Sequence, residues 1–228
     1  MPSSAVATSQ HRRTPVQRRS RARVERILLA AEQIVVGEDF EALTTRAVAE
    51  RAKMPVATLY QYFADREAIL AALIERHVTA MDARLAEDLA ALHTYSIDAI
   101  VRTVVTAYVA GYQARPSFVV LWFQGRVSAD SVARVRTRTA QLAAQFHSFG
   151  LAAGLLRPDT DPLVIELAAD TIDGFLDLAY RKQLAGDQRV VRAGIEMIVS
   201  YLERYATPTG IAGVAASELA ARWEAPDP

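Results

Sequence analysis

The sequence predicts an all-α protein in which a small N-terminal three-helix domain precedes a larger helical domain. The chain has 228 residues, a length that suits one small module and one larger module. Hydrophobic residues make up 51% of it, and from Val24 to Tyr205 they recur three and four positions apart, as in amphipathic helices. The third observation is the segment 44–63, which has the pattern of a helix, a turn and a second helix.

Basic residues are concentrated at the N-terminal end. The net charge of the chain is zero, but residues 1–70 hold 11 basic and 8 acidic residues, and six arginines precede the first acidic residue, Glu25. A polyanionic partner would therefore meet this end. Residues 1–18, rich in Ser, Thr, Pro and Arg, are expected to form a flexible basic arm. Such an arm either contacts phosphates or a minor groove, or is a solvated tail.

Three helices are expected after the arm. Residues 19–36 carry apolar side chains at helical spacing, and Gly37 ends this first helix. Thr44 can cap the second helix, because its hydroxyl accepts a hydrogen bond from an unpaired N–H of the first turn. Pro55 suits the first position of the third helix, over residues 56–62, since its fixed φ is already helical.

The third helix is expected to rest on the domain core and face another molecule. It is too short to be stable alone. Leu59 and Phe63 lie one turn apart and can face inward. The outward positions are then small side chains and two tyrosines, which fit a helix pressed against another molecule's surface.

These residues resemble a known family. The segment has the pattern L-T-T-R-x-x-A, then T-L-Y-x-x-F, then a basic residue three positions on and a hydrophobic pair. This pattern is similar to that of the DNA-binding domain of the tetracycline-repressor (TetR) family. The resemblance covers residues 24–73. The chain departs from it at Lys53, where the family's turn usually has Gly, and at Pro55, where Ser, Thr or an acidic residue is usual.

The resemblance implies that residues 19–72 bind double-stranded DNA. Hydroxyl groups and Arg66 are expected to hold phosphates, whereas Gln61 and Arg46 are the candidates for base contacts. The full set of expected DNA-binding residues is Thr44, Thr45, Arg46, Lys53, Pro55, Val56, Ala57, Thr58, Tyr60, Gln61, Tyr62 and Arg66.

A long helix is expected from Asp65 to Leu92. Asp65 suits the capping position, and Glu67 lies in the first turn, where the helix dipole favours an acid. The helix is long enough to link both domains. The resemblance implies that it acts as a lever between a ligand pocket and the DNA-binding domain.

The larger domain is expected over residues 73–207, with a loose tail over 208–228 in which a short helix, 215–223, is possible. Asp161 can cap a helix that has Pro162 at its first position. Apolar residues at helical spacing mark five segments: 97–112, 118–123, 132–149, 163–178 and 191–205.

The last two of these helices carry apolar residues alternately four and three apart. Such seams could pair with a second copy as a four-helix bundle, and the resemblance favours this homodimer over ordinary packing within one chain. The expected dimer interface consists of Val164, Ala168, Thr171, Phe175, Leu178, Val191, Ile195, Ile198 and Leu202.

Aromatic and long apolar residues are candidates for a ligand pocket, because aromatic side chains bring contact area with a polar handle. They are Met81, Leu85, Tyr108, Tyr112, Phe118, Trp122, Phe146, Phe149 and Phe175. The alternative for each is simple core packing. An acidic stripe, Glu166, Asp170, Asp173 and Asp177, could attract a cationic ligand, but its spacing favours a solvated face.

Composition gives no indication of an enzyme. There is no cysteine, the four histidines are scattered without metal-binding spacing, and there is no phosphate-binding loop or nucleophile elbow. We therefore expect no catalytic residue, metal or cofactor. Neither a signal peptide nor an apolar run of about 18 residues is present, so a cytoplasmic location without membrane contact is expected.

The sequence thus predicts a homodimeric transcriptional regulator, a repressor released from a palindromic operator by a small, lipophilic effector. One alternative is a dimeric DNA-binding protein with no effector pocket. A helical enzyme with an accidental motif is the other.

Overall fold

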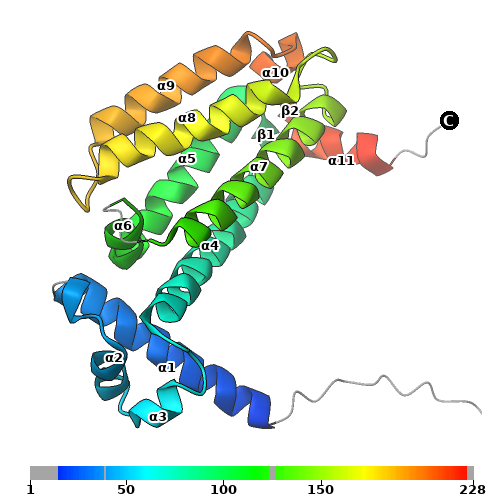
Figure 1. The fold of residues 1–228 in the computed structure, drawn as a ribbon. Coiled ribbons are helices and arrows are strands. Elements are labelled where there is room, and N and C mark those ends of the chain that lie inside the picture. The colour runs from blue at the N-terminus through cyan, green and yellow to red at the C-terminus, as the bar shows by residue number, and fades with distance from the viewer. Residues whose placement is uncertain (1–14, 39, 124–126, 225–228) are drawn as a thin grey trace, which may run out of the picture. The chain divides into compact units, whose positions relative to one another are not determined.

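The computed structural model describes residues 15–38, 40–123 and 127–224. Helices make up nearly all of the secondary structure, and the described residues contain a single short pair of strands (Figure 1). The predicted all-α class is confirmed. No helix in these ranges is both long and apolar enough to cross a membrane.

The chain divides into two compact units, Met1–Ile69 and Leu70–Pro228. The boundary falls inside one uninterrupted helix, α4 (Arg66–Ala90). Asp65 precedes this helix, and its Oδ1 accepts a hydrogen bond of 2.8 Å from the backbone N–H of Ala68. This is the capping role that the sequence predicts.

The N-terminal unit contains α1 (Pro15–Gly37), the 3₁₀ turn η1 (Phe40–Ala42), α2 (Thr45–Arg51) and α3 (Val56–Leu59). α1 begins four residues before the predicted start, so residues 15–18 are helical. The rest of the predicted arm lies outside the described residues. Buried apolar side chains from α1, α2 and α3 form the core: Ile27, Ala31, Ile34, Val48, Ala49 and Leu59.

The larger unit contains five main helices after α4. Side chains at the position before the helix cap four of them, by accepting a backbone hydrogen bond from the first turn: Ser96, Ser128, Asp161 and Asp187. The helices are α5 (Ile97–Ala114), α6 (Pro116–Phe123), α7 (Ala129–Ala152), α8 (Pro162–Tyr180) and α9 (Gln188–Glu203).

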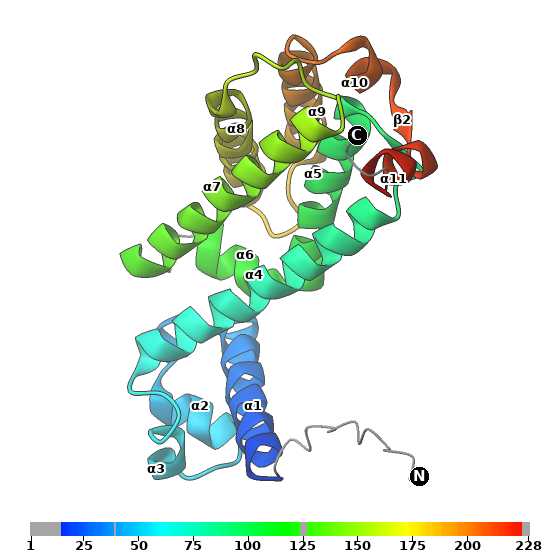
Figure 2. The same cartoon turned by 90° about the vertical axis from the view of Figure 1, so that its right-hand side faces the viewer.

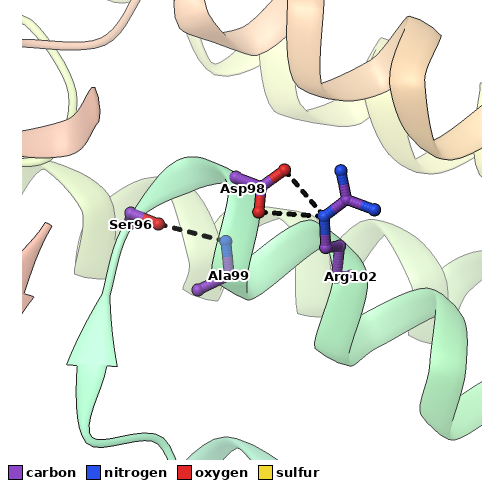
Figure 3. Close-up of polar contacts among 4 residues, drawn as sticks. All are labelled: Ser96, Asp98, Ala99 and Arg102. Atoms are coloured by element: carbon purple, nitrogen blue, oxygen red, sulfur yellow. Dashed lines mark hydrogen bonds and ion pairs between the residues drawn. The ribbon is translucent and has the colours of Figure 1, made fainter. Parts of the chain in front are cut away.

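The start of α5 shows how local sequence fixes a helix end (Figure 3). Ser96 Oγ accepts a hydrogen bond of 3.1 Å from the N–H of Ala99. One turn on, the two carboxylate oxygens of Asp98 accept from Arg102 Nε at 2.8 and 2.9 Å. An exposed pair of this kind contributes only about 0.3–0.5 kcal/mol, so the helix depends mainly on the burial of its apolar face.

Packing in the larger unit joins α8 to both α7 and α9, and α9 to α5 (Figure 1). Aromatic rings hold α6 against this group. Tyr112 of α5 stacks on Phe118 of α6 with ring centroids 5.5 Å apart, and it meets Tyr180 of α8 edge-on at 5.0 Å. Each such pair adds about 0.5–1.5 kcal/mol beyond area burial.

The C-terminal segment is built into the larger unit. It forms α10 (Pro208–Ala212), β2 (Val214–Ala215) and α11 (Ala216–Glu224). β2 pairs in antiparallel register with β1 (Thr94–Tyr95), and α10 packs on α5. Figure 2 shows α10, β2 and α11 following one another at one end of the larger unit. The possible helix in this region is therefore present, but the segment is not a loose tail.

Hydrogen bonds at close backbone contact hold α10 in place. Thr207 Oγ1 donates to the carbonyl oxygen of Gly154 at 2.6 Å and accepts from the N–H of Gly210 at 3.0 Å. Gly210 lies against Leu155, so that a Cβ atom added to Gly210 would overlap the Leu155 carbonyl group. Only glycine fits this position without a shift of the backbone.

Candidate nucleic-acid interface and interior cavities

Hydrogen bonds fix both the start of α2 and the turn between α2 and α3. Thr44 Oγ1 accepts a hydrogen bond of 3.1 Å from the N–H of Ala47, the predicted cap. Lys53 has a φ of 53°, in the left-handed region that non-glycine residues rarely adopt. Arg26 of α1 donates to the carbonyl oxygens of Ala52 and Lys53, at 2.8 and 3.3 Å. The turn thus has a glycine-like geometry despite its lysine, and an arginine from α1 supports it.

The outward surface of α3 is made of small and polar side chains. Leu59 is fully buried and Phe63 nearly so, as predicted. α3 ends at Leu59 rather than residue 62, and a turn follows. The remaining side chains are half-buried or exposed: Val56, Ala57, Thr58, Tyr60, Gln61 and Tyr62. Val56, Ala57 and Thr58, at the start of α3, are small enough to let this helix approach a DNA groove closely.

Two tyrosine hydroxyls beside α3 are held by neighbouring helices. Tyr60 Oη lies 3.1 Å from Thr45 Oγ1 at the start of α2. Arg23 of α1 donates from Nη1 to Tyr62 Oη at 3.2 Å, and this hydrogen bond lowers the pKa of Tyr62. Both hydroxyls are therefore positioned before any phosphate arrives. In the sequence, Arg23 stands out only as part of the basic run, because its hydrogen bond to a tyrosine 39 positions away has no local signal.

Positive charge surrounds this surface. Arg46 and Lys53 are exposed. Arg66 is half-buried, and its Nη1 lies 3.8 Å from Glu41 Oε2, so that a phosphate would compete with this carboxylate. Thr44, by contrast, uses its hydroxyl as the cap, which leaves its backbone and methyl group for any contact with DNA.

The larger unit contains a mostly apolar cavity of about 100 Å³, here called the main cavity, with walls from α4, α5, α7 and α8. A side cavity of about 320 Å³ adjoins it and shares Leu85, Phe146 and Phe149. A small cavity of about 30 Å³ adjoins it on another side and shares Tyr108 and Asp173. The three cavities lie side by side, since each neighbour shares wall residues with the main cavity.

The surroundings raise the pKa of both Asp173 and Tyr108. Burial of the carboxyl group and the charge of Asp170 raise the pKa of Asp173 to about 6, against an opposing effect of Arg136. Asp173 is nevertheless exposed to solvent over much of its surface, so we place its carboxyl group at the cavity mouth, not deep inside the cavity. Burial, with the Asp173 charge, raises the pKa of Tyr108 to about 12 and keeps its hydroxyl neutral.

Comparison with known proteins identifies the small unit. Residues 27–73 match the family model of bacterial regulatory proteins, tetR family. A TetR-family transcriptional regulator from Streptomyces coelicolor is 28% identical, with a TM-score of 0.62 over 80% of this chain and 99% of that chain. Residues 27–73 thus match the DNA-binding domain of the TetR family, and the predicted resemblance to that family is confirmed.

More distant TetR-like folds share the architecture. A transcriptional regulator from Rhodococcus sp. Rha1 is 19% identical, with a TM-score of 0.63 over 80% of this chain and 97% of that chain. FadR from Bacillus subtilis, solved in complex with stearoyl-CoA, is 16% identical, with a TM-score of 0.62 over 78% of this chain and 98% of that chain. At these identities the likeness shows the fold alone. No curated protein matches the sequence significantly.

The predicted pocket residues fall into three groups. Leu85, Tyr108, Phe146 and Phe149 line the main cavity. The small cavity is lined by Met81, Tyr112, Phe118 and Trp122. Phe175 lines neither of them and packs instead against Gly194, where an added Cβ would lie 2.5 Å from the ring.

Several wall residues of the main cavity had no distinctive sequence signal. Aliphatic residues of α5 and α8 complete the wall, among them Val101, Val104, Ile165 and Ile172. Helical spacing marks them as inward-facing, but core residues have the same spacing. Of the acidic stripe, Asp173 lines the cavity, while Glu166 and Asp170 are exposed and Asp177 lies 3.6 Å from Arg181. The predicted solvated face fits Glu166 and Asp170, and Asp173 is exposed as well, although it also lines the cavity.

The predicted dimer residues lie mostly inside the chain. Thr171 is half-buried, and its hydroxyl donates to the Leu167 carbonyl at 2.7 Å, while Leu178 is exposed. The other seven are buried where α8, α9 and α5 pack together: Val164, Ala168, Phe175, Val191, Ile195, Ile198 and Leu202. This corrects the expected interface, because packing within one chain, the alternative considered, already covers these seven side chains.

No three His, Asp or Glu side chains come together as a metal site would require, within residues 15–38, 40–123 and 127–224.

Proposed function

We propose that this protein is a homodimeric repressor of the TetR family, which binds a palindromic operator and leaves it when a small apolar ligand occupies the main cavity. The observation that supports the DNA contact is the outward surface of α3, with tyrosine hydroxyls held in place by Thr45 and Arg23. Hydroxyl and cationic groups of this kind position a protein on phosphates, and side chains of α3 then read the base edges.

The cavity supports the ligand-controlled part of the proposal. Leu85 of α4 lines the main cavity, and the same helix begins at Arg66, beside the expected phosphate contacts. A ligand that moves α4 would change the spacing of two DNA-binding units, which must match about one turn of DNA, ~34–36 Å. The FadR of Bacillus subtilis, similar in fold, binds stearoyl-CoA, which favours a ligand role for the corresponding unit here.

Reciprocal binding is the test of this function. A library of apolar molecules is screened by thermal shift on the full chain, since a ligand that binds only the folded state raises the melting temperature. The affinity of the best binder is then measured with and without DNA from the protein's own upstream region. We expect that DNA to weaken ligand binding by about 10-fold, because coupling between two sites is reciprocal. Equal affinities would contradict ligand release and favour a DNA-binding protein without an effector site.

The dimer surface that we propose is the outward face of α8 and α9, on the opposite side from the seven buried residues. α8 and α9 run side by side (Figure 1). Four large apolar side chains are exposed on these two helices: Leu163, Leu167, Leu178 and Met197. The three leucines lie on one stripe of α8, and Gly174 between them leaves the helix surface open to close approach. Two such faces can close as a four-helix bundle.

Leu167→Asp should convert the dimer into monomers. Leu167 is 51% exposed in one chain, so the change costs the monomer little, but each copy would bury an unpaired carboxylate at the interface. We expect dimer affinity to fall by at least about 100-fold, measured by sedimentation equilibrium. Ile211→Asp is the matched control, because Ile211 is 55% exposed on α10, away from the proposed face. Dimers of unchanged affinity in Leu167→Asp would place the interface elsewhere.

A further inference from the structure

We propose that the main cavity selects an apolar amine, which binds with its cationic nitrogen against the Asp173 carboxylate and its hydrocarbon body among the aliphatic and aromatic walls. This inference rests on the proposed function, because it names the chemical class of the effector. It follows from the polar groups of the cavity, the charges that face them and the direction in which the apolar space extends.

Asp173 is the only charged residue among the described residues that line the main cavity. Tyr108 and Thr139 supply hydroxyl groups on the same wall, where the main and small cavities meet. No described residue forms a hydrogen bond or an ion pair with the Asp173 carboxylate. The cavity therefore offers a negative charge without a positive partner, and an ammonium group would supply that partner.

The surrounding charges exclude an acidic ligand. Asp170, on the same helix, adds negative charge, and Tyr108 of α5 stays neutral. On α7, Arg138 lines the small cavity but is already paired with Asp82 of α4. Arg136 of α7 is exposed and acts on Asp173 only at a distance. A carboxylate ligand would lie beside Asp173 with no cation in the main cavity to receive it.

The apolar space extends away from Asp173. The side cavity adjoins the main cavity at Leu142, Phe146 and Phe149, and Asp173 does not line it. The acid that does line it, Asp82, is already paired with Arg138. A bound molecule would thus have its charge at one end and hydrocarbon at the other. This arrangement suits a chain-like or fused apolar body that carries a terminal amine.

Titration of Asp173 gives this selection a pH dependence. Its pKa of about 6 is above the ordinary value, so the carboxylate is ionised at pH 7.5, at a cost to the folded state. A nearby ammonium group offsets that cost. Amine binding should accordingly weaken as the pH falls through 6, where Asp173 takes up a proton while an alkyl amine stays charged.

Three octyl compounds test the proposal on the full-length protein: octylamine, 1-octanol and octanoate. They share a hydrocarbon chain and differ in head-group charge. At pH 7.5 we expect octylamine to bind at least about 10-fold more tightly than octanol, and octanoate to bind most weakly, by isothermal titration calorimetry. Asp173→Asn should make amine and alcohol equal. Glu166→Gln is the control on the same helix, because Glu166 is exposed and lines none of the three cavities; it removes one negative charge and should retain the preference.

The outcomes separate this inference from the proposed function. The amine proposal would be overturned if amine and alcohol bound the unmodified protein equally. It would also be overturned if the preference for the amine survived Asp173→Asn. Either result would leave an effector cavity that selects a different chemical class. Binding of none of the three would overturn the effector cavity itself.

A stability measurement tests whether the Asp173→Asn variant remains folded. Because the pKa of Asp173 is raised in the folded state, the fold favours the neutral carboxyl group. This contribution to stability is complete below the ordinary pKa of 3.8 and is lost as the pH rises through about 6, where Asp173 ionises. The Asp173→Asn variant cannot ionise at this position, so its stability does not fall over this pH range. Its melting temperature should exceed that of the unmodified protein at pH 7.5, and the difference should vanish below pH 4. A lower melting temperature at pH 7.5 would mean that Asp173 has a structural role instead.

Discussion

Ala57→Glu should abolish operator binding while the protein stays folded. Ala57 is exposed near the start of α3, so a longer side chain meets no core atom there, and the helix dipole favours an acid in the first turn. In a complex with DNA the carboxylate would face phosphates and base acceptors, and like-charge juxtaposition costs several kcal/mol. We expect at least a ~100-fold loss of affinity in a mobility-shift assay on the upstream DNA.

Ala140→Glu is the control for the change in net charge. Ala140 is exposed on α7 of the larger unit and lines none of the three cavities. This variant should bind DNA with nearly unchanged affinity and show only the weak effect of one added negative charge at a distance. If Ala57→Glu bound as well as Ala140→Glu, α3 would not be the helix that enters the groove.

Gly210→Ala should cause the largest loss of stability from a single methyl group. The added Cβ would overlap the Leu155 carbonyl group, and because this is backbone, no side chain can rotate away. Overpacking typically costs about 1–3 kcal/mol, and the absence of a flexible neighbour places this site at the upper end. A loss of about 3 kcal/mol would lower the melting temperature by about 6–12 °C in a chain of this size.

The neighbouring residue provides the comparison for this variant. Ile211→Ala changes an exposed side chain on the same short helix and should alter stability by less than about 0.5 kcal/mol. Both variants are measured by thermal unfolding at equal protein concentration, since a dimer's melting temperature depends on concentration. Equal melting temperatures for the two would show that α10 can shift away from Leu155 at little cost.

Features that depend on near neighbours were predictable. The caps at Thr44, Asp65 and Asp161 each bond a backbone N–H two or three residues on, so the sequence alone locates them. The inward side chains Leu59 and Phe63 followed from a spacing of one helical turn. These local rules fix the helix-turn-helix well.

Features that depend on distant neighbours were not predictable. α8 is apolar on two faces, and Val164 and Ala168 on one face have the same spacing as Leu163 and Leu167 on the other. Spacing alone therefore does not tell which face packs within the chain and which stays exposed. The position of Asp173 within an acidic stripe gave no sign that it alone of the four acids lines a cavity, because that depends on how α5 and α7 pack beside α8.

The pairing of β1 with β2 has a consequence for the protein during its synthesis. About 120 residues separate Thr94 from its partner Ala215, so at about 5–20 residues per second the first strand waits roughly 6–24 s for the second to be translated. Until then Leu155 and Ala153 lack the cover of Val214 and Leu219. The core of the N-terminal unit, by contrast, comes from residues 27–69 and is translated early. A nascent or prematurely ended chain thus carries a complete DNA-binding unit beside an open, apolar larger unit, the form of this protein that chaperones and proteases would meet.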